Sequence, residues 1–157
     1  MSIVATSKQN RVLALGAVCV ATGFAAGILA APVKKMAVVP IEQAQFMPVN
    51  PSRPDGPQLA VLWGDAATGP SSMLLRFART DGTPHVHSSD YHLVVLEGTM
   101  KHWGEGQSQA EVKPLAPGSY WFQPGEEVHA DACLSDECLM FVQWAGKRDA
   151  RLAPAAR

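Results

Sequence analysis

After residue 57, short apolar runs alternate with clusters of turn-forming residues, and this alternation is what most constrains the fold. The runs are rich in β-branched, aromatic and aliphatic side chains, while Gly, Pro, Asp and Ser separate them. No stretch beyond residue 31 shows the 3.6-residue apolar period of a helix over three turns, so we predict an all-β domain, a jelly roll or small β-barrel. The expected strands are Leu59–Trp63, Met73–Phe77, His92–Leu96, Met100–Trp103, Tyr120–Phe122 and Leu139–Trp144.

Residues 1–31 differ in composition from the rest of the chain and predict an export signal peptide or a membrane-anchor helix. Lys8 and Arg11 precede an uncharged, apolar stretch from residue 12 to 31. Its small residues near the end suit cleavage, whereas its length suits a helix of about 20 residues that spans a bilayer. We therefore expect an exported, periplasmic protein, either soluble or tethered to the inner membrane through residues 12–31.

Three further segments follow this leader. Residues 32–58 contain six prolines, too many for a helix or a central strand, and predict a linker or an extended arm lying on the barrel. Residues 59–146 are the expected barrel, and residues 147–157 a C-terminal tail.

The charge balance argues against nucleic acid as a partner. The chain has 13 Lys and Arg against 14 Asp and Glu, so no strong positive field is available to bind phosphate backbones. The partners we consider are a small-molecule ligand and a second copy of the chain, which would form a homodimer.

The placement of the histidines is the most informative functional feature. His85 and His87 flank Val86, so on a strand both imidazoles point to one face, about 7 Å apart along the backbone. His92 follows at the start of the next apolar run, and His129 lies much further along the chain. The remaining histidine, His102, is expected to be a surface or packing residue.

The spacing of these histidines, with the glycines and proline around them, resembles both sequence motifs of the cupin superfamily. In the first motif a glycine precedes an H-x-H pair, a glutamate and a second glycine; in the second a glycine precedes a proline and a histidine. The corresponding residues are Gly82, His85, His87, His92 and Gly98, followed by Gly118, Pro124 and His129. This resemblance covers about residues 59–146 and implies a single cupin jelly roll.

Several short segments more specifically resemble an uncharacterised bacterial cupin family related to the zinc-binding cupin domain of ChrR-type anti-sigma factors. No helical sigma-binding domain precedes the barrel, so the resemblance does not imply anti-sigma activity. The segments are residues 63–65, 85–92, 120–125 and 131–135.

The cupin resemblance implies one divalent metal ion, held by His85, His87, His92 and His129. Where most cupins place a glutamate ligand, this chain has Tyr91 or His92, and we favour His92. Imidazoles bind several first-row metals, so zinc, copper, iron and manganese all remain candidates.

The number of ligands separates two functions. An open three-histidine site would suit an enzyme, most plausibly a metal-dependent dioxygenase acting on a small oxygenated organic molecule. A closed four-histidine zinc site would suit a non-catalytic sensor or ligand-binding module. Tyr91 and Glu97 lie nearest the ligands in the sequence and are the candidate catalytic acid or base.

Cys133 and Cys138 bracket a polar four-residue segment that we expect to be a loop between two strands. In an exported protein, such a pair favours a disulfide that closes the hairpin. Alternatively, Cys133 lies four residues beyond His129 and could stand beside the ion as a free thiol.

Overall fold

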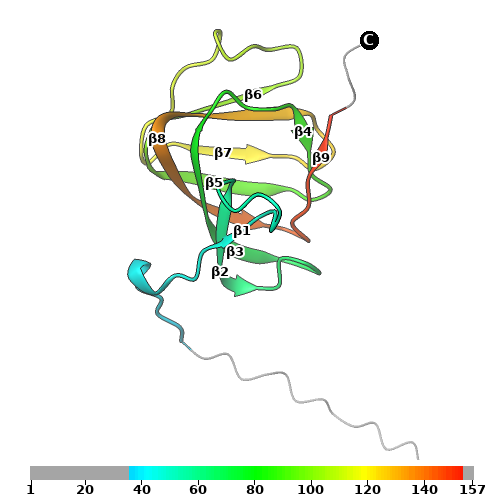
Figure 1. Ribbon diagram of the computed structural model, residues 1–157. Helices are drawn as coiled ribbons and strands as arrows, with labels where there is room; N and C mark the ends of the chain where they lie inside the picture. Colours follow the sequence, from blue (N-terminus) through cyan, green and yellow to red (C-terminus); the bar gives the residue numbers. More distant parts are fainter. Residues whose placement is uncertain (1–35, 154–157) are drawn as a thin grey trace, which may run out of the picture. The chain divides into compact units, whose positions relative to one another are not determined.

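The computed structural model describes residues 36–153, which form nine β-strands and one short 3-10 helix (Figure 1). All-β architecture is therefore confirmed for this part of the chain. The predicted signal or anchor helix lies outside the described residues, and no membrane-spanning helix occurs between residues 36 and 153. The elements are η1 (Ile41–Gln43), β1 (Met47–Pro48), β2 (Gln58–Gly64), β3 (Ser71–Thr80), β4 (His85–Val86), β5 (Tyr91–Glu97), β6 (Met100–Gly104), β7 (Tyr120–Gln123), β8 (His129–Trp144) and β9 (Arg151–Leu152).

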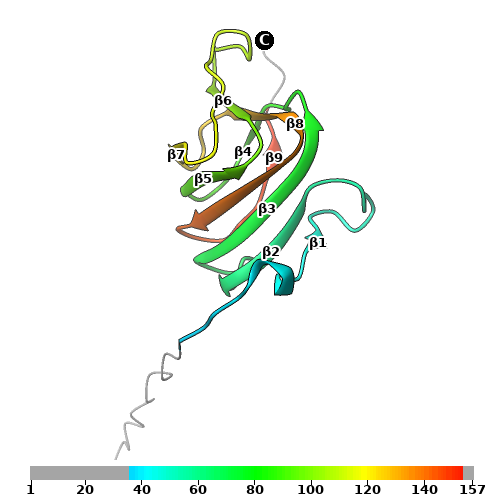
Figure 2. The ribbon, with the colours of Figure 1, turned by 90° about the vertical axis from the view of Figure 1, so that its left-hand side faces the viewer.

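The long strand β8 organises the sheet, because it changes partners along its length. Residues 129–133 pair with β6, whereas residues 139–144 pair with β5 on one edge and with β3 on the other. All these pairings are antiparallel, and the sheet curls so that β5, β6 and β7 face the broad surface of β3 (Figure 2). The inner space of this curled sheet holds the core and the candidate site.

Strand β5 shows how residue alternation sets the inner and outer faces. Tyr91, Leu93 and Val95 are almost completely buried, whereas His92 and Leu96 face outward, as the two-residue period of a strand requires. The core cluster consists of Met73, Tyr91, Leu93, Val95, Met100, Trp121, Cys133, Cys138, Met140, Val142 and Trp144.

Parts of the predicted arm and tail join the sheet. In the segment predicted as a linker or arm, β1 pairs with the edge strand β2. Nearby, Phe46 packs against a second, smaller cluster on the other face of the sheet, and the guanidinium of Arg76 lies 3.9 Å from its ring centroid. In the segment predicted as a tail, β9 pairs with β4. The ordered fold therefore extends beyond residues 59–146 at both ends.

Two glycines of the first cupin motif occupy backbone positions that other residues would strain. Gly82 and Gly98 have φ of 81° and 79°, in the left-handed region. A Cβ at Gly82 would lie 2.6 Å from the carbonyl oxygen of Asp131, and one at Gly98 would lie 2.6 Å from that of Glu137. Both glycines let a turn approach the backbone of β8 closely.

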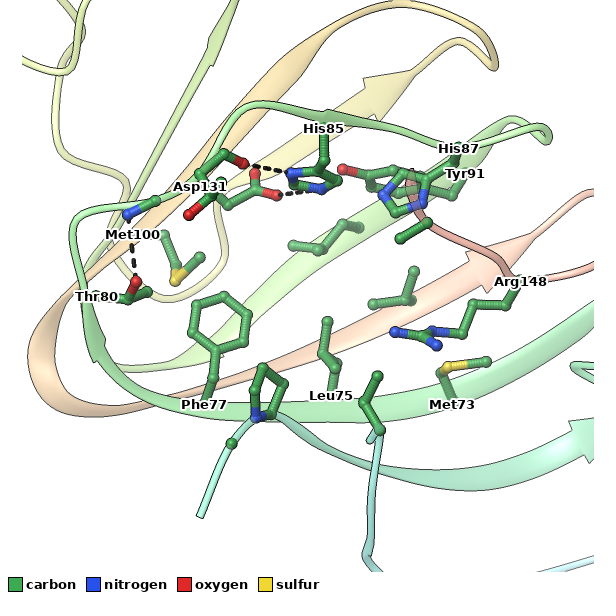
Figure 3. Close-up of a pocket in the computed structure, with 18 of the residues that line it drawn as sticks. Met73, Leu75, Phe77, Thr80, His85, His87, Tyr91, Met100, Asp131 and Arg148 are labelled. Carbon is green, nitrogen blue, oxygen red and sulfur yellow. Dashed lines mark hydrogen bonds and ion pairs between the residues drawn. The ribbon is translucent and has the colours of Figure 1, made fainter. Parts of the chain in front are cut away.

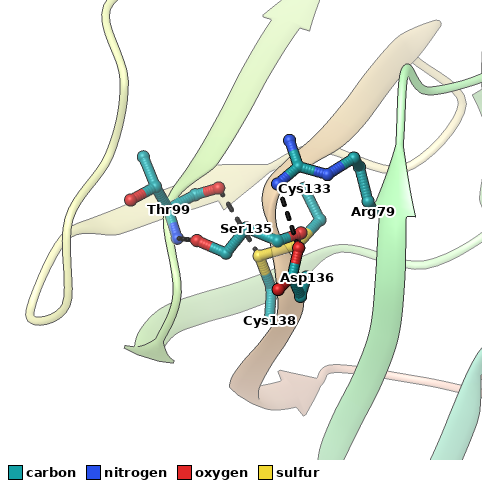
Figure 4. Close-up of a disulfide and its surroundings, with 6 residues drawn as sticks. All are labelled: Arg79, Thr99, Cys133, Ser135, Asp136 and Cys138. Carbon is teal, nitrogen blue, oxygen red and sulfur yellow. Dashed lines mark hydrogen bonds and ion pairs between the residues drawn. A yellow bond between two sulfur atoms is a disulfide. The ribbon is translucent and has the colours of Figure 1, made fainter.

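Cys133 and Cys138 are joined by a disulfide, as the sequence analysis expects, but the surrounding structure differs from the expected hairpin (Figure 4). Both cysteines belong to the single strand β8, so the predicted loop between two strands is corrected. Their Cα atoms are 5.9 Å apart, whereas a flat strand would separate them by about 17 Å. The disulfide therefore closes a bend where β8 changes partners, and Cys133 is not a free thiol.

Leucine truncation on the two faces of β5 tests this assignment of inside and outside. Leu93 is 3% exposed and Leu96 is 40% exposed. We expect Leu93→Ala to lower the free energy of unfolding by about 2–5 kcal/mol because it leaves a cavity. Leu96→Ala, the matched control, should cost about 1 kcal/mol or less. Urea unfolding followed by tryptophan fluorescence measures both; equal losses would contradict the register of β5.

Removing the disulfide tests its contribution to stability. Closing so short a loop restricts the unfolded chain by about 2 kcal/mol. We expect the double variant Cys133→Ala/Cys138→Ala to lose about that much unfolding free energy, and Ala avoids placing a hydroxyl at two fully buried sites. Dithiothreitol should destabilise the wild type and leave the variant unchanged; a reductant effect of equal size on both would exclude the bridge.

Candidate metal site

Three histidines from two distant segments converge at one point of the inner face. His85 and His129 have ring centroids 4.4 Å apart, His85 and His87 4.8 Å, and His87 and His129 5.1 Å. One ligand atom from each lies within 4.8 Å of the others. The structure thus brings together three of the four histidines that the cupin resemblance assigns as ligands.

Strand pairing produces this convergence. His85 on β4 is the register partner of His129 at the start of β8. His87 lies two residues after His85 and shares its face, while Val86 between them is buried on the other side. Histidines that are more than 40 residues apart in the sequence are thereby held side by side.

Each of the three imidazoles is oriented by a hydrogen bond from Nδ1 to a backbone carbonyl. His85 donates to Thr83 at 2.7 Å, and His129 donates to Glu127 at 3.0 Å. His87 donates to the carbonyl of Asp149, in the C-terminal segment. These bonds place the proton on Nδ1 and leave Nε2 unprotonated, which is the tautomer that a metal ligand requires.

Burial keeps His87 and His129 neutral. Desolvation lowers the pKa of His87 to about 4, and the hydrogen bond to Asp149 only partly offsets it. Burial also lowers the pKa of His129, which is 1% exposed. At neutral pH both rings therefore carry an available lone pair, and this donor set fits a divalent first-row metal ion.

A carboxylate that sequence reasoning missed lies beside the cluster. One oxygen of Asp131 is 3.8 Å from Nε2 of His85, and the other accepts a 2.6 Å hydrogen bond from Nδ1 of His102. Burial opposes ionisation of Asp131, but its interaction with His102 outweighs that effect and lowers the pKa of the carboxyl. The negative charge favours a cation at the site. Its sequence signal is its position two residues after His129, on the same face of a strand.

Tyr91 lies in the site, with its hydroxyl 3.2 Å from Nε2 of His129 and 3.3 Å from the indole nitrogen of Trp121, which donates to it. The tyrosine is 3% exposed, and burial raises its pKa well above the ordinary value. The phenol therefore stays protonated at neutral pH. It occupies the inward position where most cupins place a glutamate.

The structure does not bring His92 or Glu97 to the cluster. His92 follows Tyr91, so its ring points to the outer face of β5, where Nδ1 lies 2.7 Å from the hydroxyl of Tyr120. Glu97 is exposed at the far end of β5. The expectations of a fourth histidine ligand and of a second acid or base at residue 97 do not fit this geometry. The remaining histidine, His102, stacks on Trp121 with centroids 4.7 Å apart, as a packing residue.

The cluster opens into a cavity of about 600 Å³, within the usual range for small-molecule sites (Figure 3). His85, His87, Tyr91 and Asp131 line one side of it, and Arg148 reaches in at one end. The cavity thus combines a polar side with an apolar wall. That wall includes Met73, Leu75, Phe77, Leu93, Val142 and Trp144.

The sequence matches one known protein family over most of its length. Residues 37–150 match the family described as a domain of unknown function, DUF4437. The chain belongs to this family. None of the curated proteins matches the sequence. The matched range contains strands β1 to β8 and ends directly before β9.

Solved structures show that this DUF4437 chain has the cupin fold. KdgF from Halomonas sp. is 22% identical, covers 72% of this chain and 97% of its own, and has a TM-score of 0.57. The polyketide cyclase RemF from Streptomyces resistomycificus is 20% identical, with coverages of 78% and 88% and a TM-score of 0.60. An RmlC-like cupin from Shewanella frigidimarina is 17% identical, with coverages of 73% and 95% and a TM-score of 0.57. The ChrR relationship remains a prediction.

The zinc content of histidine variants tests which histidines are ligands. We expect purified wild type to bind one equivalent of zinc, and His87→Ala to lose it because one of three ligands is gone. His92→Ala, the matched control on the outer face of β5, should keep one equivalent. Equilibrium dialysis with elemental analysis measures the stoichiometry. Full occupancy in His87→Ala, or loss in His92→Ala alone, would contradict the three-histidine site.

Proposed function

We propose that this chain is an exported, metal-dependent enzyme that acts on a small oxygenated organic molecule, and specifically a dioxygenase. The observation that carries the proposal is the three-histidine cluster facing a cavity of about 600 Å³. Three protein ligands leave coordination positions for other groups, and the cavity provides space for a substrate beside them.

A bound divalent ion would supply a Lewis-acidic centre that attracts anionic oxygen ligands. His85, His87 and His129 would hold it through Nε2, since each Nδ1 is already bonded to a carbonyl. Asp131 would balance part of the positive charge from its position near His85. The apolar wall of the cavity would exclude water from the substrate.

Tyr91 is the chain's own proton-handling group in this proposal. Its hydroxyl is protonated at neutral pH and lies beside the ligand nitrogen of His129, so it can donate a hydrogen bond to a substrate oxygen at the cluster. Trp121 donates to the same oxygen and fixes the orientation of the phenol.

The geometry favours an enzyme over the sensor alternative. A closed four-histidine zinc site would need His92, whose ring is bonded to Tyr120 on the outer face. Among the described residues, only His85, His87 and His129 have ligand atoms close enough together to hold one ion, so no fourth histidine completes a tetrahedron.

A second candidate is a non-oxidative reaction in which Tyr91 transfers a proton. The position of the Tyr91 hydroxyl favours it, and a polyketide cyclase and the DMSP lyase DddQ from Ruegeria pomeroyi have the same type of fold. These neighbours are 20% identical to this chain, so they support the fold and not the reaction.

Two features support export. The apolar segment 12–31 has the composition of a signal or anchor, and the Cys133–Cys138 disulfide suits an oxidising compartment such as the periplasm. In that compartment the ion would be acquired after translocation.

Oxygen dependence distinguishes the two reactions. Chain loaded separately with zinc, copper, iron or manganese is supplied with diketones, flavonols and thiols, and oxygen uptake and product formation are followed with and without air. A dioxygenase consumes oxygen stoichiometrically with substrate and is inactive without air. Turnover without air would contradict the dioxygenase and support the non-oxidative reaction. No turnover with any loaded metal would count against an enzyme.

Two variants test the residue roles in that assay. His87→Ala should abolish activity with the loss of metal. Tyr91→Phe should retain metal and lose roughly 100-fold or more in kcat, because only the hydroxyl is removed. Unchanged kcat in Tyr91→Phe would show that the tyrosine is a packing residue.

A further inference from the structure

One arginine in the cavity has no acidic partner. Arg148 is partly buried, and its guanidinium reaches into the cavity close to Met73 (Figure 3). It forms no ion pair or side-chain hydrogen bond with any residue between 36 and 153. Burial lowers the pKa of this guanidinium, which still remains charged at neutral pH.

The carboxylate next in the sequence, that of Asp149, already has other partners. Asp149 accepts hydrogen bonds from the backbone and the hydroxyl of Ser88, each at 2.8 Å. It also pairs with Lys147 at 3.1 Å. The charge of Asp149 also acts on Arg148, but the two side chains form no ion pair, so no carboxylate of the described residues contacts the Arg148 guanidinium directly.

The other arginines that line the cavity differ from Arg148. Arg79 is exposed and pairs with Asp136 at 3.2 Å, and Arg151 pairs with Glu126. Arg53 lies exposed on the arm before β2. Among the lining residues that the structure describes, Arg148 is thus the partly buried cation without a protein anion.

A second donor in the same wall lacks an acceptor. The indole N–H of Trp144 is buried and has no hydrogen-bond partner among the described residues. Its ring packs between His87, at 4.8 Å, and Tyr91, at 4.7 Å. The indole nitrogen has almost no exposed surface, so neighbouring atoms cover this N–H, and the donor that faces the cavity is Arg148.

We propose that Arg148 binds a carboxylate of the substrate, so that the substrate is an organic acid with an apolar body and a second oxygen function for the metal site. This inference rests on the proposed function, which it deepens. The guanidinium offers a planar, two-pronged donor that matches a carboxylate, and the apolar wall between Arg148 and the histidines would contact the rest of the molecule.

Matched acid and amide probes test the proposal in the zinc-loaded chain. The probes are 3,4-dihydroxybenzoate and 3,4-dihydroxybenzamide, together with 3-(3,4-dihydroxyphenyl)propanoate and its amide, which have the same metal-binding hydroxyls and two spacer lengths. Calorimetry should show at least one acid binding about tenfold or more tighter than its amide. Arg148→Gln should remove that preference by weakening only the acid, and Arg148→Lys should keep part of it.

The control variant is Arg79→Gln, which lines the same cavity but removes an exposed, paired arginine. It should leave the preference unchanged. The melting temperature of each variant shows that it is folded. An equal preference in wild type and Arg148→Gln, or no preference in wild type, would overturn the proposal even if zinc binds.

The acid preference is also measured in His87→Ala, which should not hold zinc. Overall affinity should fall there while the preference for the acid persists, because Arg148 remains. Loss of the preference in His87→Ala would place the carboxylate on the ion and overturn the role of Arg148. Absence of zinc binding in the wild type, with the preference intact, would instead count against the proposed function alone.

Discussion

The antiparallel pairing of β4 with β8 is the constraint on which the site depends. It sets His85 opposite His129, and the two-residue period of the strand then brings His87 to the same face. The glycine turn at residue 82 makes this pairing feasible, because only a residue without a Cβ fits against the carbonyl of Asp131. Backbone hydrogen bonding, rather than affinity among the imidazoles, therefore assembles the cluster.

The site gathers uncharged donors around a single buried negative charge. Desolvation holds His87 and His129 neutral and Tyr91 protonated, whereas Asp131 stays ionised through its bond to His102. Such an arrangement suits a cation at the histidines and an anionic group further into the cavity. The carbonyls that accept from each Nδ1 come from three separate segments, so the ring orientations depend on the whole fold.

The sequence was sufficient to predict the all-β class, most strand positions and the three inward histidines, because alternation and motif spacing are local signals. It was not sufficient to choose between Tyr91 and His92, since a shift of one residue exchanges the two faces of β5 and the motif tolerates either spacing. The unbroken course of β8 was missed because its polar residues 134–137 resemble a loop. Asp131 follows His129 by two residues and could have been found from strand alternation, whereas Arg148 lies 19 residues beyond His129 and only the fold brings it to the cavity.

In the C-terminal segment that follows β8, two adjacent residues contribute to the site in different ways. The backbone carbonyl of Asp149 orients His87, and the preceding side chain, Arg148, reaches into the cavity. Any movement of this short stretch must displace both the ring that would hold an ion and the cation that would meet a ligand. The orientation of His87 and the position of the Arg148 cation in the cavity are therefore coupled through two adjacent residues of backbone.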